Sequence, residues 1–418
     1  MRIILIESGT YETFTTLAAQ LVAMGHEVYD FCVDETVIKG HLAAGYTVEP
    51  FLDQAPDLVI TANFFLSREV NHLIRHLIPG DFPVVNLTWG HPVAEVEPIL
   101  RRAGDVPGCN AQLRENRLFL WIPCPFAAEE YARLGFANGF YAPLGGFGFR
   151  LAQGHQYRWM RWGEPFADLR SLPVSTGEVH GKKPEAYDLI YLGDMPEPPT
   201  RRDERLEAWA LETATACVAR PQESRLQQQE PLREMLIADG SIRSVERFLC
   251  FQQWFFQHHA RLTRQSFVHA VAREFGARFL LYGDAWIAQG LAAHPRASVA
   301  RKHFYQRIPL SVDFGSMSFE TCFFPRTIEI IKSGGTLLGY RRPDSAGLFA
   351  SLPEAPVFDN EEALLQQARR LLAEPETRDR CRAAQWELVN GEQVAARGLA
   401  RMIEAVFQGE ISPFAPRS

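Results

Sequence analysis

Two charged residues, Arg326 and Glu329, lie three positions apart in a segment that runs from Pro325 to Gly334-Gly335. Proline is tolerated in the first turn of a helix and glycine commonly ends one, so the segment predicts a short helix with both charges on one face. A guanidinium beside an exposed helix N-terminus can hold a diphosphate, because the guanidinium and the backbone N–H groups both attract it. A carboxylate one turn deeper can accept both hydroxyls of a ribose. The same spacing also suits an ordinary i,i+3 salt bridge, so both interpretations stay open here.

A second candidate for chemistry is His91, which follows an apolar strand in Trp89-Gly90-His91-Pro92. A histidine titrates near neutrality and can therefore accept a proton. The alternative is a loop histidine that shapes the turn before Pro92. Three carboxylates are weaker candidates for a base: Glu7, Glu12 and Asp105.

The first 150 residues alternate short apolar strands with helical segments, which is typical of a parallel sheet built from βαβ units. The predicted strands are 2–7, 27–33, 57–63, 83–88 and 117–122, and the predicted helices are 14–24, 69–77 and 127–134. Ligands of such sheets bind at the carboxyl ends of the strands. That edge gathers Gly9-Thr10-Tyr11, Asn63-Phe64 and the turn at His91. The first of these loops lacks the G-x-G-x-x-G pattern, which gives little support to a dinucleotide site.

A second α/β pattern follows a Gly- and Pro-rich connection over 145–185. Its predicted strands are 187–192, 278–282, 309–313 and 336–340, and its predicted helices fill most of 200–275, then 361–373, 376–389 and 392–407. Gly193 and Gly283 each end a strand, where a backbone can approach a ligand closely or make a tight turn. We expect two α/β domains that face each other across a deep cleft, residues 1–184 and 185–390, with a C-terminal helix over 391–418 near the domain junction.

Length and composition agree with a two-domain globular enzyme, since the chain has 418 residues, 46% of them hydrophobic and 22% charged. The net charge of −7 argues against a general nucleic-acid binder. No run reaches the roughly 18 apolar residues that a membrane helix needs. The apolar N-terminus is short and ends in a carboxylate, which favours a strand over an export signal. Seven cysteines without a CxxC pair indicate reduced thiols, a cytoplasmic location and no structural zinc.

The segment 326–335, Arg-Thr-Ile-Glu-Ile-Ile-Lys-Ser-Gly-Gly, resembles the R-x-x-E-x-x-x-x-G-G signature of glycosyltransferases with the GT-B architecture. It is most similar to the CgeB-like, spore-maturation-type group. Residues 358–364, Phe-Asp-Asn-Glu-Glu-Ala-Leu, resemble the F-x-D-x-E-E-L segment of that group, and 371–378 resemble its L-x-x-P-E-x-R junction. The resemblance covers roughly residues 278–407, while the N-terminal half matches only in βαβ style.

The resemblance implies two facing Rossmann-like domains, of which the C-terminal one holds a nucleotide sugar. Glu329 would bind the ribose, while Arg326 and the turn before it would hold the diphosphate. Tyr282 would face the base, or it belongs to the core. The remaining residues expected around the donor are Gly193, Gly283, Ser316, Phe319 and Thr327.

The catalytic candidates under this resemblance are Glu320 and His91. Glu320 occupies roughly the place of the first acid in an E-x7-E motif, although eight residues separate it from Glu329. Members of the CgeB-like group often carry an acid in a W-x-D-x-P turn, so His91 is a departure. The acceptor, a protein, a glycan or a small molecule, would lie against Gly9, Thr10 and Tyr11.

The resemblance also implies transfer without a metal or other cofactor, in agreement with the lack of a D-x-D motif in the sequence. Asp194 and Asp284 are single acids after strands and are not expected to bind metal. Two other classes remain open: a non-catalytic binding or assembly protein of the same fold, and a nucleotide-sugar epimerase. The aromatic block 248–269 with His258 and His259 is expected to be core or an interface, and Arg201, Arg202 and Arg205 a solvated helix start.

Overall fold

The computed structural model of the chain describes residues 1–7, 12–32, 55–62, 80–88, 91–142, 157–161, 186–193, 195, 203–220, 230–237, 241–295, 301–315, 325–342, 356–390 and 392–408. The chain forms two compact units. Unit 1 comprises Met1–Leu172, Glu234–Glu246 and Glu392–Ser418, and unit 2 comprises Pro173–Arg233 and Arg247–Gly391. Each unit is built on one parallel sheet, which confirms the two predicted α/β domains. The predicted boundaries at 184/185 and 390/391 adjoin residues outside the described ranges and stay predictions.

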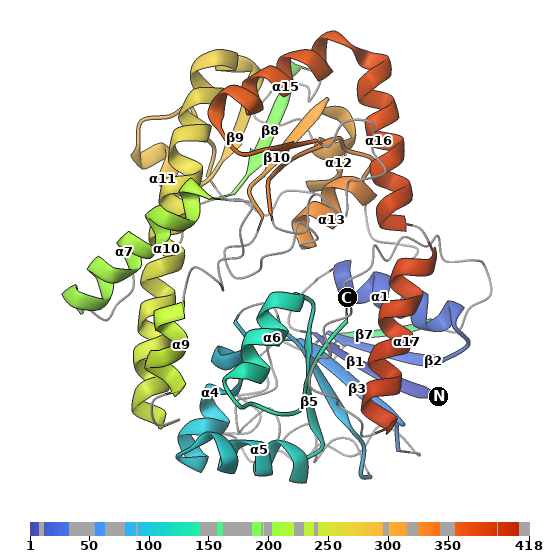
Figure 1. The fold of residues 1–418 in the computed structure, drawn as a ribbon. Coiled ribbons are helices and arrows are strands. Elements are labelled where there is room, and N and C mark those ends of the chain that lie inside the picture. The colour runs from blue at the N-terminus through green and yellow to red at the C-terminus, as the bar shows by residue number, and fades with distance from the viewer. Residues whose placement is uncertain are drawn as a thin grey trace. The chain divides into compact units, whose positions relative to one another are not determined.

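Unit 1 contains a seven-stranded sheet in the order β6-β5-β4-β3-β1-β2-β7 (Figure 1). Its strands are β1 (Arg2–Glu7), β2 (Glu27–Cys32), β3 (Leu58–Ala62), β4 (Val84–Leu87), β5 (Leu118–Ile122), β6 (Gly139–Tyr141) and β7 (Tyr157–Arg161). All pairings are parallel. The apolar run in β1 does not alternate, because Ile3, Ile4 and Leu5 are all fully buried in the middle of the sheet.

Strand β7 lies inside 145–185, the segment predicted to be a connection, so that prediction is wrong for Tyr157–Arg161. The strand pairs with β2, from Val28 beside Tyr157 to Cys32 beside Arg161. Aromatic residues favour strands, but a five-residue strand framed by glycine and proline leaves little periodic signal. The glycine- and proline-rich composition of the segment therefore prevents the prediction of this edge strand from sequence.

The helices of unit 1 begin and end at recognisable caps where those are described. Helix α4 has His91 as its N-cap and ends at Gly104, which adopts the left-handed conformation with φ of 86°. Helix α5 is capped by Asp105, whose side chain accepts from the Gly108 N–H. The helices are α1 (Glu12–Ala23), α4 (Pro92–Ala103), α5 (Val106–Glu115), α6 (Pro125–Arg133) and α17 (Glu392–Gln408), with α9 (Glu230–Ile237) divided between the units.

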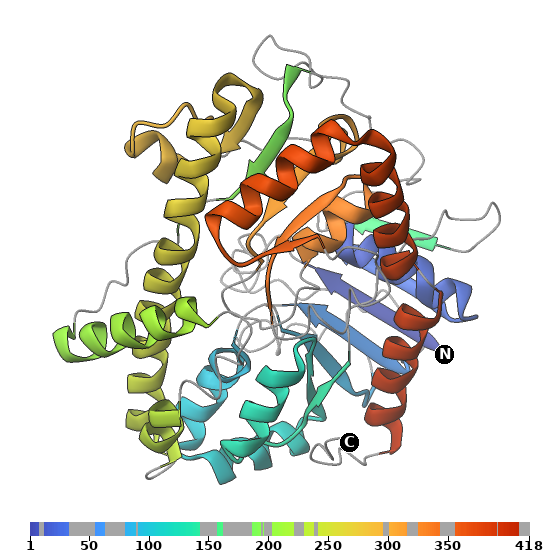
Figure 2. The ribbon, with the colours of Figure 1, turned by 45° about the horizontal axis from the view of Figure 1, so that its top comes forward.

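Unit 2 contains a five-stranded parallel sheet in the order β12-β11-β10-β8-β9. Its strands are β8 (Leu189–Leu192), β9 (Phe279–Tyr282), β10 (Leu310–Asp313), β11 (Leu337–Tyr340) and β12 (Val357–Phe358). An aromatic core supports the sheet: the ring of Phe267 lies 5.7 Å from Phe314 and 5.2 Å from Phe358. Helix α15 contributes Leu364, Ala368 and Leu371 to this core. Its ribbon lies over the strands of the sheet (Figure 2).

The other helices of unit 2 include one unusually long element, α10, of 34 residues. Its residues up to Glu246 belong to unit 1 and the rest to unit 2. Phe248, Phe251 and Phe255 are at most 1% exposed, which confirms the prediction that the aromatic block is structural. The helices are α7 (Glu204–Ala219), α10 (Ile242–Phe275), α11 (Asp284–Ala288), α12 (Arg301–Arg307), α13 (Pro325–Lys332), α15 (Glu361–Ala373) and α16 (Pro375–Asn390), with a 3-10 turn η3 (Gly276–Arg278). Among the described residues, no helix has the length and apolar character needed to cross a membrane.

Candidate functional site

The carboxyl ends of β8, β9 and β10 bring several predicted residues of unit 2 together. The Gly193 N–H donates to the Tyr282 carbonyl at 3.3 Å, so the residues that end β8 and β9 are neighbours. A Cβ on Gly193 would lie 2.9 Å from Nη1 of Arg326, which follows β10 on helix α13. Gly283, with φ of 147°, lies so close that its own Cβ would be 2.7 Å from the Gly193 carbonyl oxygen. Residues far apart in the sequence therefore meet at the sheet edge where α/β proteins bind ligands.

Gly193 is expected to tolerate no side chain. Gly193→Ala would place a methyl group 2.6 Å from Cζ of Tyr191, a side chain that is 1% exposed, and would crowd the Arg326 guanidinium. Overpacking of this kind costs about 2 kcal/mol of unfolding free energy. Thermal unfolding of the variant measures the effect. Gly339→Ala is the matched control, because its new Cβ would make ordinary contacts starting at 3.6 Å; equal losses in both variants would contradict the expectation.

Arg326 forms its ion pair with Asp313, not with Glu329. Nη1 of Arg326 lies 3.7 Å from Oδ1 of Asp313, and the Thr327 hydroxyl donates to the other oxygen of Asp313 at 2.9 Å. Within the described part of the chain, no hydrogen bond occupies the N–H groups of Arg326, and its side chain is 22% exposed. The i,i+3 salt bridge that sequence spacing leaves open is therefore not the observed arrangement. The guanidinium is held from one side and keeps its donors available for a ligand.

The electrostatic surroundings keep Arg326 cationic. Burial lowers the pKa of the guanidinium, but the neighbouring charges of Asp313, Tyr191, Tyr305 and Glu329 together raise that pKa above its ordinary value. The first turn of α13, which begins at Pro325 as predicted, adds backbone N–H groups beside this cation. The combination of a helix N-terminus and a cation suits a bound anion.

Tyr282 and Glu329 differ in how they are placed. Tyr282 is 4% exposed and its ring lies 5.4 Å from His294, so its side chain belongs to the core; burial raises the pKa of its hydroxyl to about 12. The predicted contact of Tyr282 with the base of the nucleotide stays a prediction. Glu329 is half-buried and lies close enough to Arg326 to influence the pKa of that guanidinium.

His91 lies in unit 1 with both ring nitrogens engaged. Nδ1 accepts from the Val93 N–H at 3.3 Å, and Nε2 lies 2.7 Å from Oε2 of Glu130. Since Nδ1 accepts, the network assigns the ring proton to Nε2, which donates it to Glu130. The side chain is 6% exposed. This geometry makes His91 a helix cap that shapes the turn before Pro92, and the predicted role as a base would require the Val93 contact to open.

Unit 1 also contains a half-buried carboxyl that sequence reasoning missed. Oε2 of Glu95, in α4, accepts from Nδ2 of Asn86 on β4 at 3.4 Å. Burial raises the pKa of Glu95 to about 7, and the Asn86 hydrogen bond lowers it by a smaller amount. Only the (i, i+3/i+4) apolar positions of α4 signal its buried face in the sequence, and Glu95 does not belong to that pattern.

Six predicted site residues lie outside the described residues: Gly9, Thr10, Tyr11, Ser316, Phe319 and Glu320. Their roles stay predictions. Thr327 is described, and its hydroxyl donates to Asp313, the partner of Arg326. The structure therefore links Thr327 to Arg326 through Asp313. The described residues contain no group of three or more His, Cys, Asp or Glu side chains arranged to hold a metal ion.

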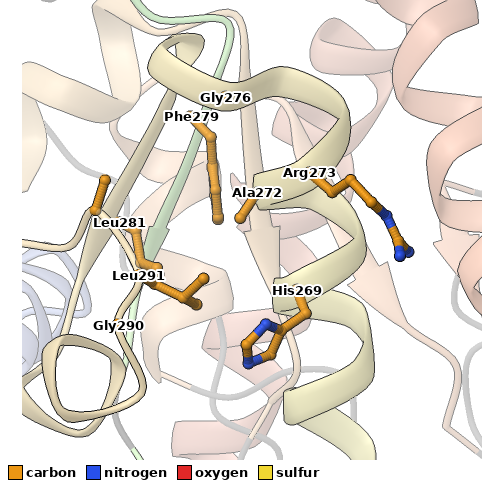
Figure 3. Close-up of a pocket in the computed structure, with 9 residues that line it drawn as sticks. His269, Ala272, Arg273, Gly276, Phe279, Leu281, Gly290 and Leu291 are labelled. Carbon is orange, nitrogen blue, oxygen red and sulfur yellow. The ribbon is translucent and has the colours of Figure 1, made fainter.

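A pocket of about 340 Å³ occurs elsewhere in unit 2, between the C-terminal part of α10 and β9 (Figure 3). Phe279, Leu281 and Leu291 face it, and His269 borders it with Nε2 3.1 Å from Oε1 of Gln289. The Arg273 guanidinium points away from these apolar side chains. None of the predicted site residues that the structure describes lines this pocket, so it is separate from the edge at Arg326.

Comparison with known proteins agrees with the chemistry of unit 2. Residues 261–404 match the family described as Glycosyl transferase-like, so this part of the chain contains a glycosyltransferase-like domain. The match includes Arg326, Thr327 and Glu329, as well as α15 and α16. No curated protein matches the chain.

Among solved structures, Anabaena Alr3699/HepE in complex with UDP and glucose is 8% identical, with a TM-score of 0.41 over 98% of this chain and 100% of that chain. SsfS6, a Streptomyces glycosyltransferase, is 11% identical, with a TM-score of 0.35 over 97% of this chain and 99% of that chain. Scores this low leave the fold assignment to rest on the two parallel sheets themselves.

Proposed function

We propose that the protein is a glycosyltransferase of the GT-B type that moves a sugar from a nucleotide-sugar donor, bound by unit 2, to an acceptor hydroxyl. The observation that carries the proposal is the guanidinium of Arg326, which Asp313 holds in place while its hydrogen-bond donors stay available at the first turn of α13. A diphosphate matches this arrangement in charge and in hydrogen-bonding capacity. The family match over residues 261–404 supports the same conclusion.

In this proposal the bond between the sugar and the diphosphate breaks as the acceptor oxygen bonds to the sugar, and the proton of the acceptor hydroxyl passes to the catalytic base, for which His91 is the candidate. Arg326 stabilises the negative charge that develops on the departing diphosphate, and the α13 N–H groups assist it. The Glu329 carboxylate accepts hydrogen bonds from the two ribose hydroxyls. Gly193 and Gly283 let the backbone approach the donor closely. In this chemistry Arg326 and the α13 N–H groups neutralise the charge that a metal ion could otherwise neutralise. We therefore propose that transfer needs no metal or other cofactor.

The remaining parts of the proposal rest on sequence. The R-x-x-E signature and the two downstream segments support a place in the CgeB-like group. His91 and Glu320 are the proposed catalytic residues, and Gly9, Thr10 and Tyr11 the proposed acceptor side. The acceptor is a protein, a glycan or a small molecule, and the reduced thiols favour action in the cytoplasm.

Glu329→Ala tests the proposal through a split between two ligands. We expect one nucleoside diphosphate from a panel of UDP, GDP, ADP, CDP and dTDP to stabilise the wild-type protein in a thermal-shift assay. Loss of two hydrogen bonds to a carboxylate should weaken the binding of that ligand by about 100-fold, as isothermal titration calorimetry would show. Binding of inorganic pyrophosphate should not weaken, since it has no ribose.

Glu362→Ala, an exposed carboxylate of α15, is the matched control and should bind both ligands like the wild type. Unchanged nucleoside diphosphate affinity in Glu329→Ala would contradict the assignment of the ribose. A wild-type protein that binds nucleotide sugars without transferring or hydrolysing them would instead indicate a binding protein, and interconversion of the bound sugar would indicate an epimerase.

A further inference from the structure

Asp313, at the carboxyl end of β10, is a buried carboxylate with two different partners. It is 2% exposed. Its Oδ2 accepts a hydrogen bond from the Thr327 hydroxyl at 2.9 Å, while its Oδ1 lies 3.7 Å from Nη1 of Arg326. Thr327 is itself 3% exposed, so the hydroxyl and the carboxylate lock each other in one orientation.

The two distances assign different tasks to the two oxygens. A separation of 2.9 Å is a hydrogen bond, whereas 3.7 Å is an ion pair too long to be one. Asp313 therefore attracts the guanidinium without taking up its N–H groups. No other ion pair involves Arg326 among the residues that the structure describes, so this carboxylate is the group that fixes the position of the cation.

We propose that Asp313 is a positioning residue that, fixed by Thr327, holds the Arg326 guanidinium in place to receive the donor diphosphate. This role rests on the proposed function and adds to it a residue that touches no substrate. Charge alone gives the opposite expectation: an anion beside the site repels a diphosphate, so removing it should strengthen binding. Weaker binding after its removal would identify positioning as the larger effect.

Asp313→Asn is the central variant, because asparagine keeps the size of the side chain and can still accept from Thr327. We expect the Kd of the nucleoside diphosphate and that of pyrophosphate both to rise by about tenfold, measured by calorimetry. In an Arg326→Ala background the same change should alter Kd by less than about twofold, because Asp313 acts through Arg326. Additive losses in the double variant, or tighter binding in Asp313→Asn, would overturn the proposal.

Two further variants separate positioning from general destabilisation. Thr327→Val should weaken the binding of pyrophosphate by about threefold. Thr327→Ser keeps the hydroxyl and should bind pyrophosphate like the wild type. Asp359→Asn breaks a half-buried ion pair of the same unit, to Arg341 at 3.1 Å, and should leave both affinities unchanged. Equal weakening in Asp359→Asn, or no recovery with serine, would count against the proposal.

A measurement without ligand distinguishes this proposal from the proposed function. Phenylglyoxal modifies arginine, and mass spectrometry gives the rate at each site. Arg326 should react about threefold or more faster in Asp313→Asn, because the guanidinium is no longer held, while Arg278 serves as an internal reference. If the wild type binds no nucleoside diphosphate but the labelling changes as expected, the proposed function fails and the coupling of Asp313 to Arg326 stands. An unchanged rate at Arg326 overturns the coupling itself.

Discussion

Arg326→Ala is expected to weaken the binding of the nucleoside diphosphate and of pyrophosphate alike, by about 100-fold. Hydrogen bonds to a charged group contribute about 1.5–3 kcal/mol each, and a guanidinium makes them in parallel pairs with phosphate oxygens. The Arg326 side chain lies in the first turn of α13 with its hydrogen-bond donors available. Alanine would therefore remove all of its hydrogen bonds to the ligand. Isothermal titration calorimetry with both ligands measures it. The equal effect on pyrophosphate distinguishes Arg326 from Glu329, whose loss should spare that ligand.

The variant has a structural cost that a second substitution separates. Alanine at 326 leaves Asp313 buried without its cation, which should lower thermal stability. Arg326→Lys keeps the charge but loses the planar fork, so we expect nearly normal stability with about tenfold weaker binding. Arg278→Ala, at the amino end of the same sheet, removes an exposed ion pair to Asp188 and is the control. Full affinity in both variants at 326 would show that the anion binds elsewhere.

The sequence predicts the elements well where the signal is local. Helix α15 occupies the predicted residues 361–373, because Asn360 supplies an N-cap and the apolar residues recur at helical spacing. The start of α13 at Pro325 and its end before Gly334 also follow from single residues. Five residues of β7 escape prediction, since a short edge strand has neither the length nor the alternation to stand out.

The site is only half predictable for a related reason. Arg326 and Glu329 can be found because their spacing places them on one helix face. Asp313 gives no such signal: it contacts Arg326 only because β10 ends beside the first turn of α13, which is a property of the folded unit. His91 shows the converse, because its partner Glu130 is 39 positions away, so its spacing in the sequence does not reveal that both ring nitrogens are hydrogen-bonded.

Glu95→Gln is expected to make the stability of unit 1 less dependent on pH. Burial raises the pKa of Glu95 to about 7 in the folded protein, from an ordinary value of 4.5. Between these values the folded state binds more protons than the unfolded state, so stability falls as the pH rises and levels off above about 7. A shift of this size corresponds to at most about 3 kcal/mol. Glutamine cannot ionise and still accepts from Asn86, so the variant should match the wild type near pH 5 and exceed it at pH 8.

Calorimetric unfolding at pH 5, 6, 7 and 8 would show the effect as a Tm difference that opens with pH, in the transition that includes unit 1. Glu97→Gln is the matched control on the same helix, because its carboxylate pairs with Arg101 at the surface and not with a buried amide. That variant should lose a little stability and keep the wild-type dependence on pH. If Glu95→Gln and the wild type instead ran parallel from pH 5 to 8, the carboxyl of Glu95 would have to be ionised in the folded state throughout. In that case a water molecule or a cation near α4 would have to stabilise the Glu95 carboxylate in addition to Asn86.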